Sequence, residues 1–251
     1  MAARLPLELG DWAAAASFRA PQPGDSGVSV VLRRFTRALG AARIPTVALV
    51  DERLDASAHG TAELLVTHAR RIVFANQAMH DLATRRLTDD SPDAAILLEH
   101  PPVFTAGRRA KPEHLVWSER EAAAHGAEVR HIDRGGSFTF HGPGQLVGYP
   151  ILTVPGKRGG GMADTVAYVR SVEQLLIDVL ADLGLSDVGR VEGLAGVWVA
   201  PDSPRPRKVA AIGVKLSRGR SMHGFALNVD TDLAWFDRIV PCGLVDKGVT
   251  S

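Results

Sequence analysis

The sequence contains a single cysteine, few lysines and no long apolar run. The lone thiol, Cys242, excludes an internal disulfide and any zinc site that requires several thiolates. No apolar stretch approaches the roughly 18 residues that a membrane span needs. The 29 basic and 28 acidic residues leave a formal charge of +1, so no overall field favours nucleic acid or an anionic membrane. We therefore expect a soluble, cytoplasmic protein that binds neither nucleic acid nor membranes.

The first 46 residues differ in composition from the rest of the 251-residue chain. They mix alanine, arginine, proline and glycine without sustained periodicity, and they contain few acids. We expect residues 1–46 to be a leader outside the fold. A disordered leader, an upstream start codon and an organelle transit peptide all fit this composition. Residues 47–251 are long enough to form one domain with its own hydrophobic core.

From residue 47 onward, strand and helix patterns alternate. Apolar runs of strand length lie at 47–50, 62–67, 94–99, 137–141 and 145–152. Helical spacing of apolar residues predicts helices over 72–87 and 165–183, the second ended by Gly184. Alternation on both sides of a turn at 217–220 predicts a hairpin. Because hairpins and crossover helices both occur, we predict a single α/β domain with a mixed β-sheet flanked by helices.

Cys242 is the first candidate for chemistry, because it lies between Pro241 and Gly243 on a predicted turn. It is either a nucleophile or a small buried apolar residue. A free thiol has a pKa of about 8.5, and lowering it by ~2 units takes about 2.7 kcal/mol of stabilisation. A nearby lysine can supply this as a charged ammonium, or can accept the proton as a neutral amine.

Two lysines on one predicted strand, Lys208 and Lys215, are candidates for that role. They lie seven residues apart, so we expect their side chains on opposite faces. Lys208 is expected to share its face with the residues that look directed into the core, which are Ala210, Ile212, Val214 and Leu216. A lysine on an apolar face is unusual because its burial costs free energy unless it has a partner. We therefore favour Lys208, with a snorkelling lysine at the strand end as the alternative.

A glycine-rich segment, residues 134–145, follows neither a Walker A loop nor a dinucleotide-binding fingerprint. Its glycines would let backbone N–H groups approach a carbonyl or phosphate oxygen, although hairpin turns explain them about equally well. His141 and His223 lack the spacing of paired metal ligands on one element. We expect them to be hydrogen-bonded polar residues, and we expect no metal site.

Six ordered motifs over residues 65–251 resemble the lipoyl(octanoyl) transferase family. The longest is RGGSFTFHGPGQLVGYP at 134–150. The others are LLEHPPVFTAGR at 97–108, GVW at 196–198, KVAAIGVK at 208–215, HGFALNV at 223–229 and PCG at 241–243. The resemblance implies an α/β domain with a mixed sheet, as in biotin and lipoate protein ligases.

The resemblance also implies roles for individual residues. In that family the cysteine of the Pro-Cys-Gly motif carries the acyl group as a thioester, and it falls on Cys242. The lysine that activates this thiol begins the Lys-Val-Ala-Ala-Ile-Gly motif, and it falls on Lys208. The family's substrate-binding segments fall on three stretches: Arg134, Gly135, Gly136, Ser137, Phe138, Thr139, Phe140 and His141; Ala211, Ile212 and Gly213; and Gly224, Phe225 and Ala226.

The implied reaction is ping-pong acyl transfer without a cofactor. The donor is octanoyl-acyl carrier protein, and the acceptors are lysines on lipoyl domains of 2-oxoacid dehydrogenase E2 subunits and on the glycine cleavage H protein. Transfer from thioester to thioester is nearly isoenergetic and transfer to an amide is downhill, so neither ATP nor a metal is needed. Two alternatives fit the fold: an ATP-dependent lipoate or biotin ligase, and an acyl-binding module without catalytic activity.

Two structural expectations follow from this chemistry. Backbone N–H groups near Gly135-Gly136 or Ile212-Gly213 are expected to hold the oxyanion. Apolar side chains are expected to wall an acyl tunnel, at about 0.8 kcal/mol for each buried methylene. The candidate walls are Phe138, Phe140, Tyr149 and Phe225. Because family members usually continue further past the cysteine motif, we expect the domain 47–251 to be truncated at its C-terminus.

Overall fold

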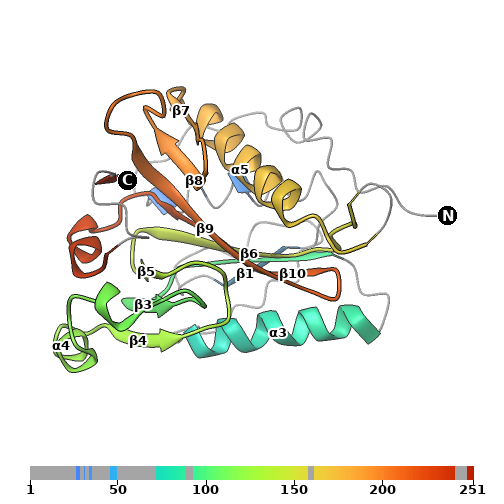
Figure 1. The fold of residues 1–251 in the computed structure, drawn as a ribbon, viewed down its shortest axis with the longest axis horizontal. Coiled ribbons are helices and arrows are strands. Elements are labelled where there is room, and N and C mark those ends of the chain that lie inside the picture. Colours follow the sequence, from blue (N-terminus) through green and yellow to red (C-terminus); the bar gives the residue numbers. More distant parts are fainter. Residues whose placement is uncertain are drawn as a thin grey trace.

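A computed structural model describes residues 27–28, 31, 34–35, 46–49, 72–88, 93–157, 161–240 and 248–251 (Figure 1). The predicted strand at 62–67 and Cys242 lie outside these described residues. Within them, no helix combines the length and the apolar character that crossing a membrane requires.

The described residues form a large mixed sheet of eight strands in the order β1-β2-β6-β10-β9-β8-β7, with β11 added beside β9. Its strands are β1 (Thr46–Leu49), β2 (Ala94–Leu98), β6 (Gln145–Ile151), β7 (Val188–Val191), β8 (Leu194–Val199), β9 (Arg207–Ser217), β10 (Arg220–Asn228) and β11 (Gly248–Val249). The β1–β2 and β9–β11 pairs are parallel and the other neighbours are antiparallel. This confirms the predicted mixed sheet and the hairpin β9–β10.

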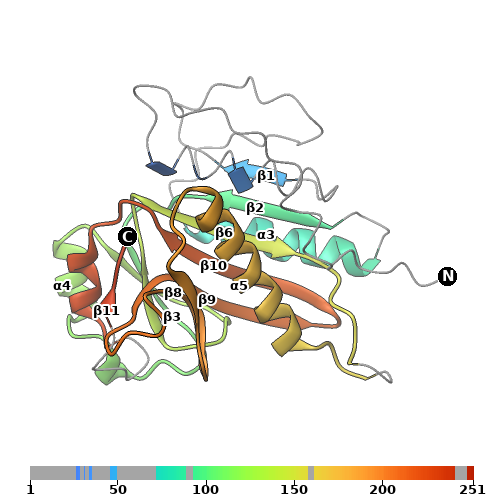
Figure 2. The same cartoon turned by 90° about the horizontal axis from the view of Figure 1, so that it is seen from above.

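Two helices cover the opposite faces of this sheet (Figures 1 and 2). Helix α3 (Ile72–Thr88) packs on β6 and β10, and α5 (Thr165–Asp182) packs on β7, β8 and β9. The Asp164 carboxylate caps α5 by accepting a hydrogen bond from Ala167 N at 3.0 Å. Gly184 follows with φ +93°, a conformation that a side chain disfavours. Both predicted helices are confirmed, as is the end of the second helix at Gly184.

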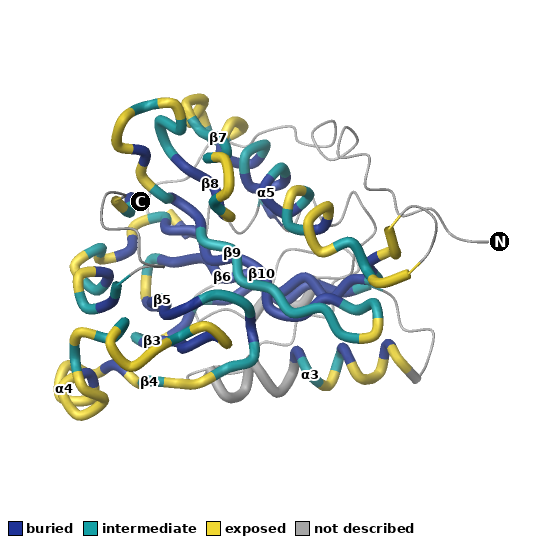
Figure 3. The backbone as a smooth tube through the Cα atoms, in the orientation of Figure 1, coloured by how far each residue is buried: buried dark blue, intermediate teal, exposed yellow. Residues whose placement is uncertain are grey.

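Strands β2 and β6 are buried throughout, and β10 is buried except at its first residue (Figure 3). Along β2, Ala95 and Leu97 join the cluster under α5, whereas Ile96 and Leu98 join the cluster under α3. Side chains of a strand alternate between faces, so one apolar run supplies two cores. Each cluster lies between the sheet and one helix, and together they fix the sheet's position.

A second, three-stranded sheet lies beside the face that carries α3 (Figure 1). Its order is β4-β3-β5, from β3 (Val103–Ala106), β4 (Glu128–His131) and β5 (Phe138–His141). The remaining elements are η1 (Pro112–His114), α4 (Glu119–Ala124) and η2 (Leu233–Arg238). Phe104 of β3, Phe140 of β5 and Trp235 of η2 join their rings in one aromatic cluster. This cluster holds η2 against the small sheet.

The prediction that residues 1–46 lie outside the fold is wrong for three side chains. Val28 and Val31 are each 5% exposed, Phe35 is fully buried, and all three belong to the core cluster under α5. The Phe35 ring stacks on Phe225 of β10 with centroids 5.1 Å apart. These residues are helical and follow i, i+3 and i+7 spacing. The compositional argument missed that spacing because it averaged over the whole segment.

Candidate active site

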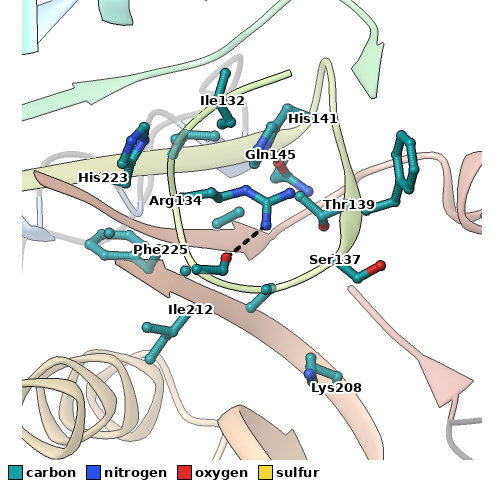
Figure 4. A pocket seen from close by; sticks show the side chains of 18 of the residues that line it. Ile132, Arg134, Ser137, Thr139, His141, Gln145, Lys208, Ile212, His223 and Phe225 are labelled. Atoms are coloured by element: carbon teal, nitrogen blue, oxygen red, sulfur yellow. Dashed lines mark hydrogen bonds between the residues drawn. The ribbon is translucent and has the colours of Figure 1, made fainter. Parts of the chain in front are cut away.

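A pocket of about 100 Å³ opens on the face of the large sheet that meets the small sheet and the loop 132–137 (Figure 4). Its floor is formed by the backbones of β6, β9 and β10, where small residues leave room above the strands. Ala211 and Gly213 on β9 lie beside Gly224 and Ala226 on β10. The floor is therefore apolar and flat, as an acyl chain requires.

The structure brings nearly all of the predicted substrate-binding residues to this pocket. The lining includes Arg134, Gly135, Gly136, Ser137, Phe138, Thr139, His141, Lys208, Ala211, Ile212, Gly213, Gly224, Phe225 and Ala226. Tyr149, a predicted tunnel wall, also lines it. Cys242 lies outside the described residues, so its distance to the pocket is not part of this geometry.

Phe140 is the exception, and its prediction as a tunnel wall is wrong. Its ring is 1% exposed and stacks on Trp235 with centroids 5.0 Å apart, in the cluster of the small sheet. Phe138 lies two residues away on β5 and lines the pocket. Phe138 and Phe140 share one face of β5, so alternation alone does not tell which of them reaches the ligand. Phe225, another predicted wall, lines the pocket, but its ring stacks on Phe35 in the cluster under α5.

Lys208 lines the pocket. The expectation that it shares a strand face with the core-directed residues of β9 is wrong. Val197 pairs with Ala210 and Trp198 pairs with Lys208, so β9 has one extra residue in this register, a β-bulge at Val209. The bulge reverses the alternation, and Lys208 shares the pocket face with Ala211. Residues beyond the bulge pack under α5 as predicted, namely Ile212, Val214 and Leu216.

The Lys208 side chain is half-buried and rests on two features of β8. Its Nζ lies 4.6 Å from the ring centroid of Trp198, a cation–π contact. Gly196 has φ +117°, and a Cβ there would lie 3.3 Å from Lys208 Cε. The glycine thus leaves space for the lysine stem, and the indole holds its amine end.

The described residues on both sides of 241–247 lie next to the pocket. On the C-terminal side, Val249 pairs with Lys208, and Thr250 N donates to Lys208 O at 3.0 Å. On the N-terminal side, Ile239 lines the pocket, and Val240 N donates to His114 O at 2.8 Å. On the C-terminal side the described chain resumes beside Lys208, and on the N-terminal side it ends next to the pocket lining.

Lys215, the other candidate lysine, is engaged elsewhere. Its Nζ forms an ion pair with Asp133 Oδ2, while Asp133 Oδ1 accepts a hydrogen bond from His223 Nε2 at 2.7 Å. Partial burial raises the pKa of Asp133, but the hydrogen bonds from Lys215 and His223 outweigh it and hold that pKa at about 2. Lys215 thus has a carboxylate partner at the opposite end of β9 from Lys208.

A single histidine–carboxylate grouping could hold a metal ion among the residues that the structure describes. One ligand atom each from His80, Asp133 and His223 lie within 4.8 Å of one another. The Lys215 ammonium already neutralises the Asp133 carboxylate. The predicted hydrogen-bonded state of His223 is confirmed by its bond to Asp133.

The loop 134–137 is fixed by hydrogen bonds from both sheets. Arg134 Nη2 donates to Thr105 O at 2.5 Å and to Thr105 Oγ1 at 2.9 Å. Gly135 N donates to Val214 O at 3.0 Å. The Gly135 N–H is therefore already bonded, so its prediction as an oxyanion donor is wrong. Gly136, with φ +93°, is the residue of this pair whose backbone turns at the pocket rim.

Buried polar side chains of β5, β6 and β10 also line the pocket. His141 Nδ1 bonds to Gln145 Oε1 at 2.7 Å, and Gln145 Nε2 donates to Asn228 Oδ1 at 2.9 Å. Asn228 Nδ2 in turn donates to Thr250 O at 2.9 Å. This chain of bonds ties β5, β6 and β10 to the residues that follow β11. Satisfied polar groups of this kind make this part of the lining rigid.

Burial of His141 predicts a pH-dependent stability. Desolvation lowers the pKa of His141 from 6.5 to about 4, although its bond to Gln145 opposes this. Between these values the unfolded chain binds a proton that the folded chain does not. The free energy of unfolding should therefore fall as the pH drops from 6.5 to 4, by up to about 1.4 kcal/mol per pH unit for this one proton.

Urea unfolding at several pH values measures this effect. His141→Gln should reduce the slope between pH 6.5 and 4, whereas His131→Gln, which removes an exposed histidine, serves as the matched control. An identical slope in the wild type and His141→Gln would show that His141 titrates normally.

Several lining residues were not predicted from the sequence as site residues. They are Ile132, Gln145, Val147, His223, Asn228, Phe236, Ile239 and Val249. Gln145, Val147 and Tyr149 lie at every second position of β6 and therefore share one face of the strand. Because Tyr149 was a predicted wall, this alternation could have identified Gln145 and Val147 as lining residues. His223 and Asn228 lie at the ends of the substrate-binding stretch on β10. Phe236, Ile239 and Val249 reach the pocket only through tertiary packing.

Comparisons with known proteins place this geometry among lipoylation enzymes. Residues 73–251 match the model of the lipoyl protein ligase A/B catalytic domain. An octanoyltransferase of Salinispora tropica is 54% identical over 166 residues, covering 66% of this chain and 72% of that protein. An octanoyltransferase of Thermobifida fusca is 52% identical over 178 residues, covering 70% and 71%.

Solved structures show the same fold at low identity. A bipartite lipoate protein ligase from Thermoplasma acidophilum matches with a TM-score of 0.57 and 16% identity, over 78% of this chain and 65% of that chain. An ATP-bound lipoate-protein ligase A matches with a TM-score of 0.54 and 16% identity, over 78% and 70%. These likenesses confirm the predicted ligase-like fold.

Proposed function

Since the chain belongs to the lipoyl protein ligase A/B catalytic domain family, we propose that it transfers an octanoyl group from acyl carrier protein, through a thioester on Cys242, to a lysine of a lipoyl domain. It is an octanoyltransferase, an acyltransferase of protein lipoylation, as its relatives at 50–55% identity are. The donor, the covalent intermediate and the roles of individual residues are the parts that need support from the site.

One observation carries the proposal: the described residues on both sides of 241–247 lie next to the pocket, and those on the C-terminal side pair with Lys208. Val249 pairs with Lys208, and Ile239 lines the same pocket. Cys242 is two residues from Val240, so it lies within about 7 Å of it along an extended chain. These neighbours support pairing Cys242 with Lys208, which is the one lysine that lines the pocket among the described residues.

Lys208 is proposed to activate the thiol. A protonated amine beside the sulfur favours the thiolate, and ~2 units of thiol pKa correspond to about 2.7 kcal/mol. The Trp198 ring and the space left by Gly196 hold the amine at the pocket rather than in bulk water.

In the first half-reaction, the Cys242 thiolate attacks the thioester carbonyl carbon of octanoyl-acyl carrier protein. A new carbon–sulfur bond forms to Cys242 and the bond to the phosphopantetheine sulfur breaks. Lys208 gives its proton to the leaving sulfur and becomes a neutral amine. The octanoyl chain lies on the apolar floor formed by Ala211 and Ala226.

In the second half-reaction, the neutral Lys208 amine takes a proton from the ammonium of the acceptor lysine. The free amine attacks the thioester, an amide forms and the bond to Cys242 breaks. The remaining proton is released to solvent, and the thiolate–ammonium pair is restored. Backbone N–H groups at Gly136 or Ile212-Gly213 are proposed to hold the oxyanion of each step.

The proposed partners follow from this chemistry. The acceptors are lipoyl domains of 2-oxoacid dehydrogenase E2 subunits and the glycine cleavage H protein, and no nucleotide, metal, nucleic acid or membrane takes part. A cytoplasmic location is part of the proposal, because a catalytic thiol needs reducing surroundings. We also propose that residues 47–251, together with the packed side chains of Val28, Val31 and Phe35, form the acyltransferase domain.

Product formation without nucleotide tests the function. Octanoyl-acyl carrier protein, an apo lipoyl domain and this protein should yield the octanoylated domain, measured by intact mass. Product that appears only with ATP and free octanoate would identify a ligase. Binding of the acyl carrier protein without any product would identify an inactive acyl-binding module.

A further inference from the structure

One histidine separates the pocket from solvent at the end opposite Lys208. His223 lines the pocket, and its side chain is 3% exposed. The groups on its other side, His80, Asp133 and Lys215, are 35%, 40% and 28% exposed. The His223 imidazole thus forms a wall, one side chain thick, between the pocket and these more exposed groups.

The pocket runs along β10 from Asn228, at the Lys208 end, to His223. Five residue steps at about 3.4 Å separate the two, roughly 17 Å between their Cα atoms. With carbon–carbon bonds of about 1.5 Å, an extended octanoyl chain is roughly 9 Å long. The side chains at both ends occupy part of the remaining length, so the channel suits a medium acyl chain.

The open route through this channel leads to His223 and not along β9. At Gly213 a Cβ would lie 3.0 Å from Arg134 Cδ and 3.1 Å from Gly135 O, so the loop covers β9 there. The lining on the other side consists of Val147, Tyr149, Gly224 and Ala226. We expect an acyl chain that starts near Lys208 to pass over β6 and β10 toward His223, which lies across the pocket from Lys208 (Figure 4).

Contacts from four elements hold the ring in place. Asp133 Oδ1 accepts a hydrogen bond from His223 Nε2 at 2.7 Å, and its Oδ2 pairs with Lys215. His80 Nε2 of α3 lies 3.9 Å from Oδ1, and the Tyr149 ring of β6 meets His223 edge-on at 6.1 Å. His223 also has φ +56°, a strained conformation that persists only because its surroundings impose it.

We propose that His223, held in position by Asp133, is the end wall of the acyl channel and sets its preference for medium chains. This rests on the proposed octanoyl transfer. A longer chain must break the His223–Asp133 hydrogen bond or push the ring toward solvent. A shorter chain leaves apolar floor uncovered, at a cost of about fourfold in affinity per missing methylene.

His223→Gly is the variant that opens the wall, and glycine accepts φ +56° without strain. Acyl-enzyme formation with octanoyl-, decanoyl- and dodecanoyl-acyl carrier protein gives kcat/KM for each chain. The decanoyl-to-octanoyl ratio should rise about tenfold or more, since two methylenes gain buried surface. Asp133→Asn keeps the size of the clamp but weakens it, and should raise the ratio in the same direction by less.

Arg218→Gly is the matched control, because Arg218 is exposed at the β9–β10 turn and also has positive φ, +49°. It should leave the ratio at the wild-type value. If the wild type forms no octanoyl-enzyme, the proposed function fails, whatever the variants do. If the wild type does form it and both His223→Gly and Asp133→Asn keep the wild-type ratio, the end wall lies elsewhere. Should His223→Gly not fold, the Asp133→Asn ratio alone decides.

Discussion

Cys242→Ser is expected to lower the rate of lipoyl-domain octanoylation by at least about 10³-fold, or 4 kcal/mol in the barrier. The hydroxyl is a far weaker acid than the thiol, so the Lys208 amine cannot keep it ionised at neutral pH. Steady-state product formation from octanoyl-acyl carrier protein, followed by mass spectrometry, measures this loss.

The interpretation of that loss needs evidence that the variant is folded. Thermal unfolding should show similar midpoints for the wild type and Cys242→Ser, and Cys242→Ala should be equally inactive. Activity close to wild type in either variant would place the nucleophile on another residue.

Lys208→Met should lower the same rate by about 10² to 10⁴-fold, the usual size of a general acid–base contribution. Methionine keeps a long apolar stem above Gly196 and against Trp198, so the change removes the amine more than the packing. The thiol pKa, measured from the alkylation rate against pH, should rise toward the ordinary value of about 8.5.

Lys215→Met is the matched control for the thiol pKa. The Lys215 ammonium binds Asp133 at the far end of β9, so its loss should leave the alkylation profile unchanged. If Lys215→Met shifts the profile and Lys208→Met does not, the roles assigned to the two lysines are wrong.

The architecture of this chain could be predicted from its sequence wherever periodicity was strong. The apolar stripe of α5, its Asp164 cap and the hairpin β9–β10 each depend on residues close together in the sequence, so short sequence patterns reveal them. The small sheet was harder, because β3 and β4 are short and their pairing joins distant segments. The packing of Phe35 on Phe225 was missed, since a core contact across 190 residues leaves no local trace.

The site was predicted mainly through motif resemblance, and its geometry corrects the reasoning from residues alone. Lys208 was chosen on strict alternation, yet a bulge at Val209 is what turns it to the pocket. A single inserted residue in a strand cannot be read from the pattern of apolar residues. Gly135 was chosen because its backbone N–H could hold an oxyanion, but in the folded chain this N–H donates a hydrogen bond to Val214 O. His223 was not predicted as a site residue, because its place at the pocket depends on contacts with residues distant in sequence, such as Asp133 and Tyr149.

The covalent intermediate tests the central claim most directly. The protein is mixed with octanoyl-acyl carrier protein without nucleotide or acceptor, quenched in acid, digested and mapped by mass spectrometry. We predict one octanoyl group as a hydroxylamine-sensitive thioester on the peptide that contains Cys242, which disappears when a lipoyl domain is added. An octanoyl group on any other residue, or none on an enzyme that still forms product, would contradict the account.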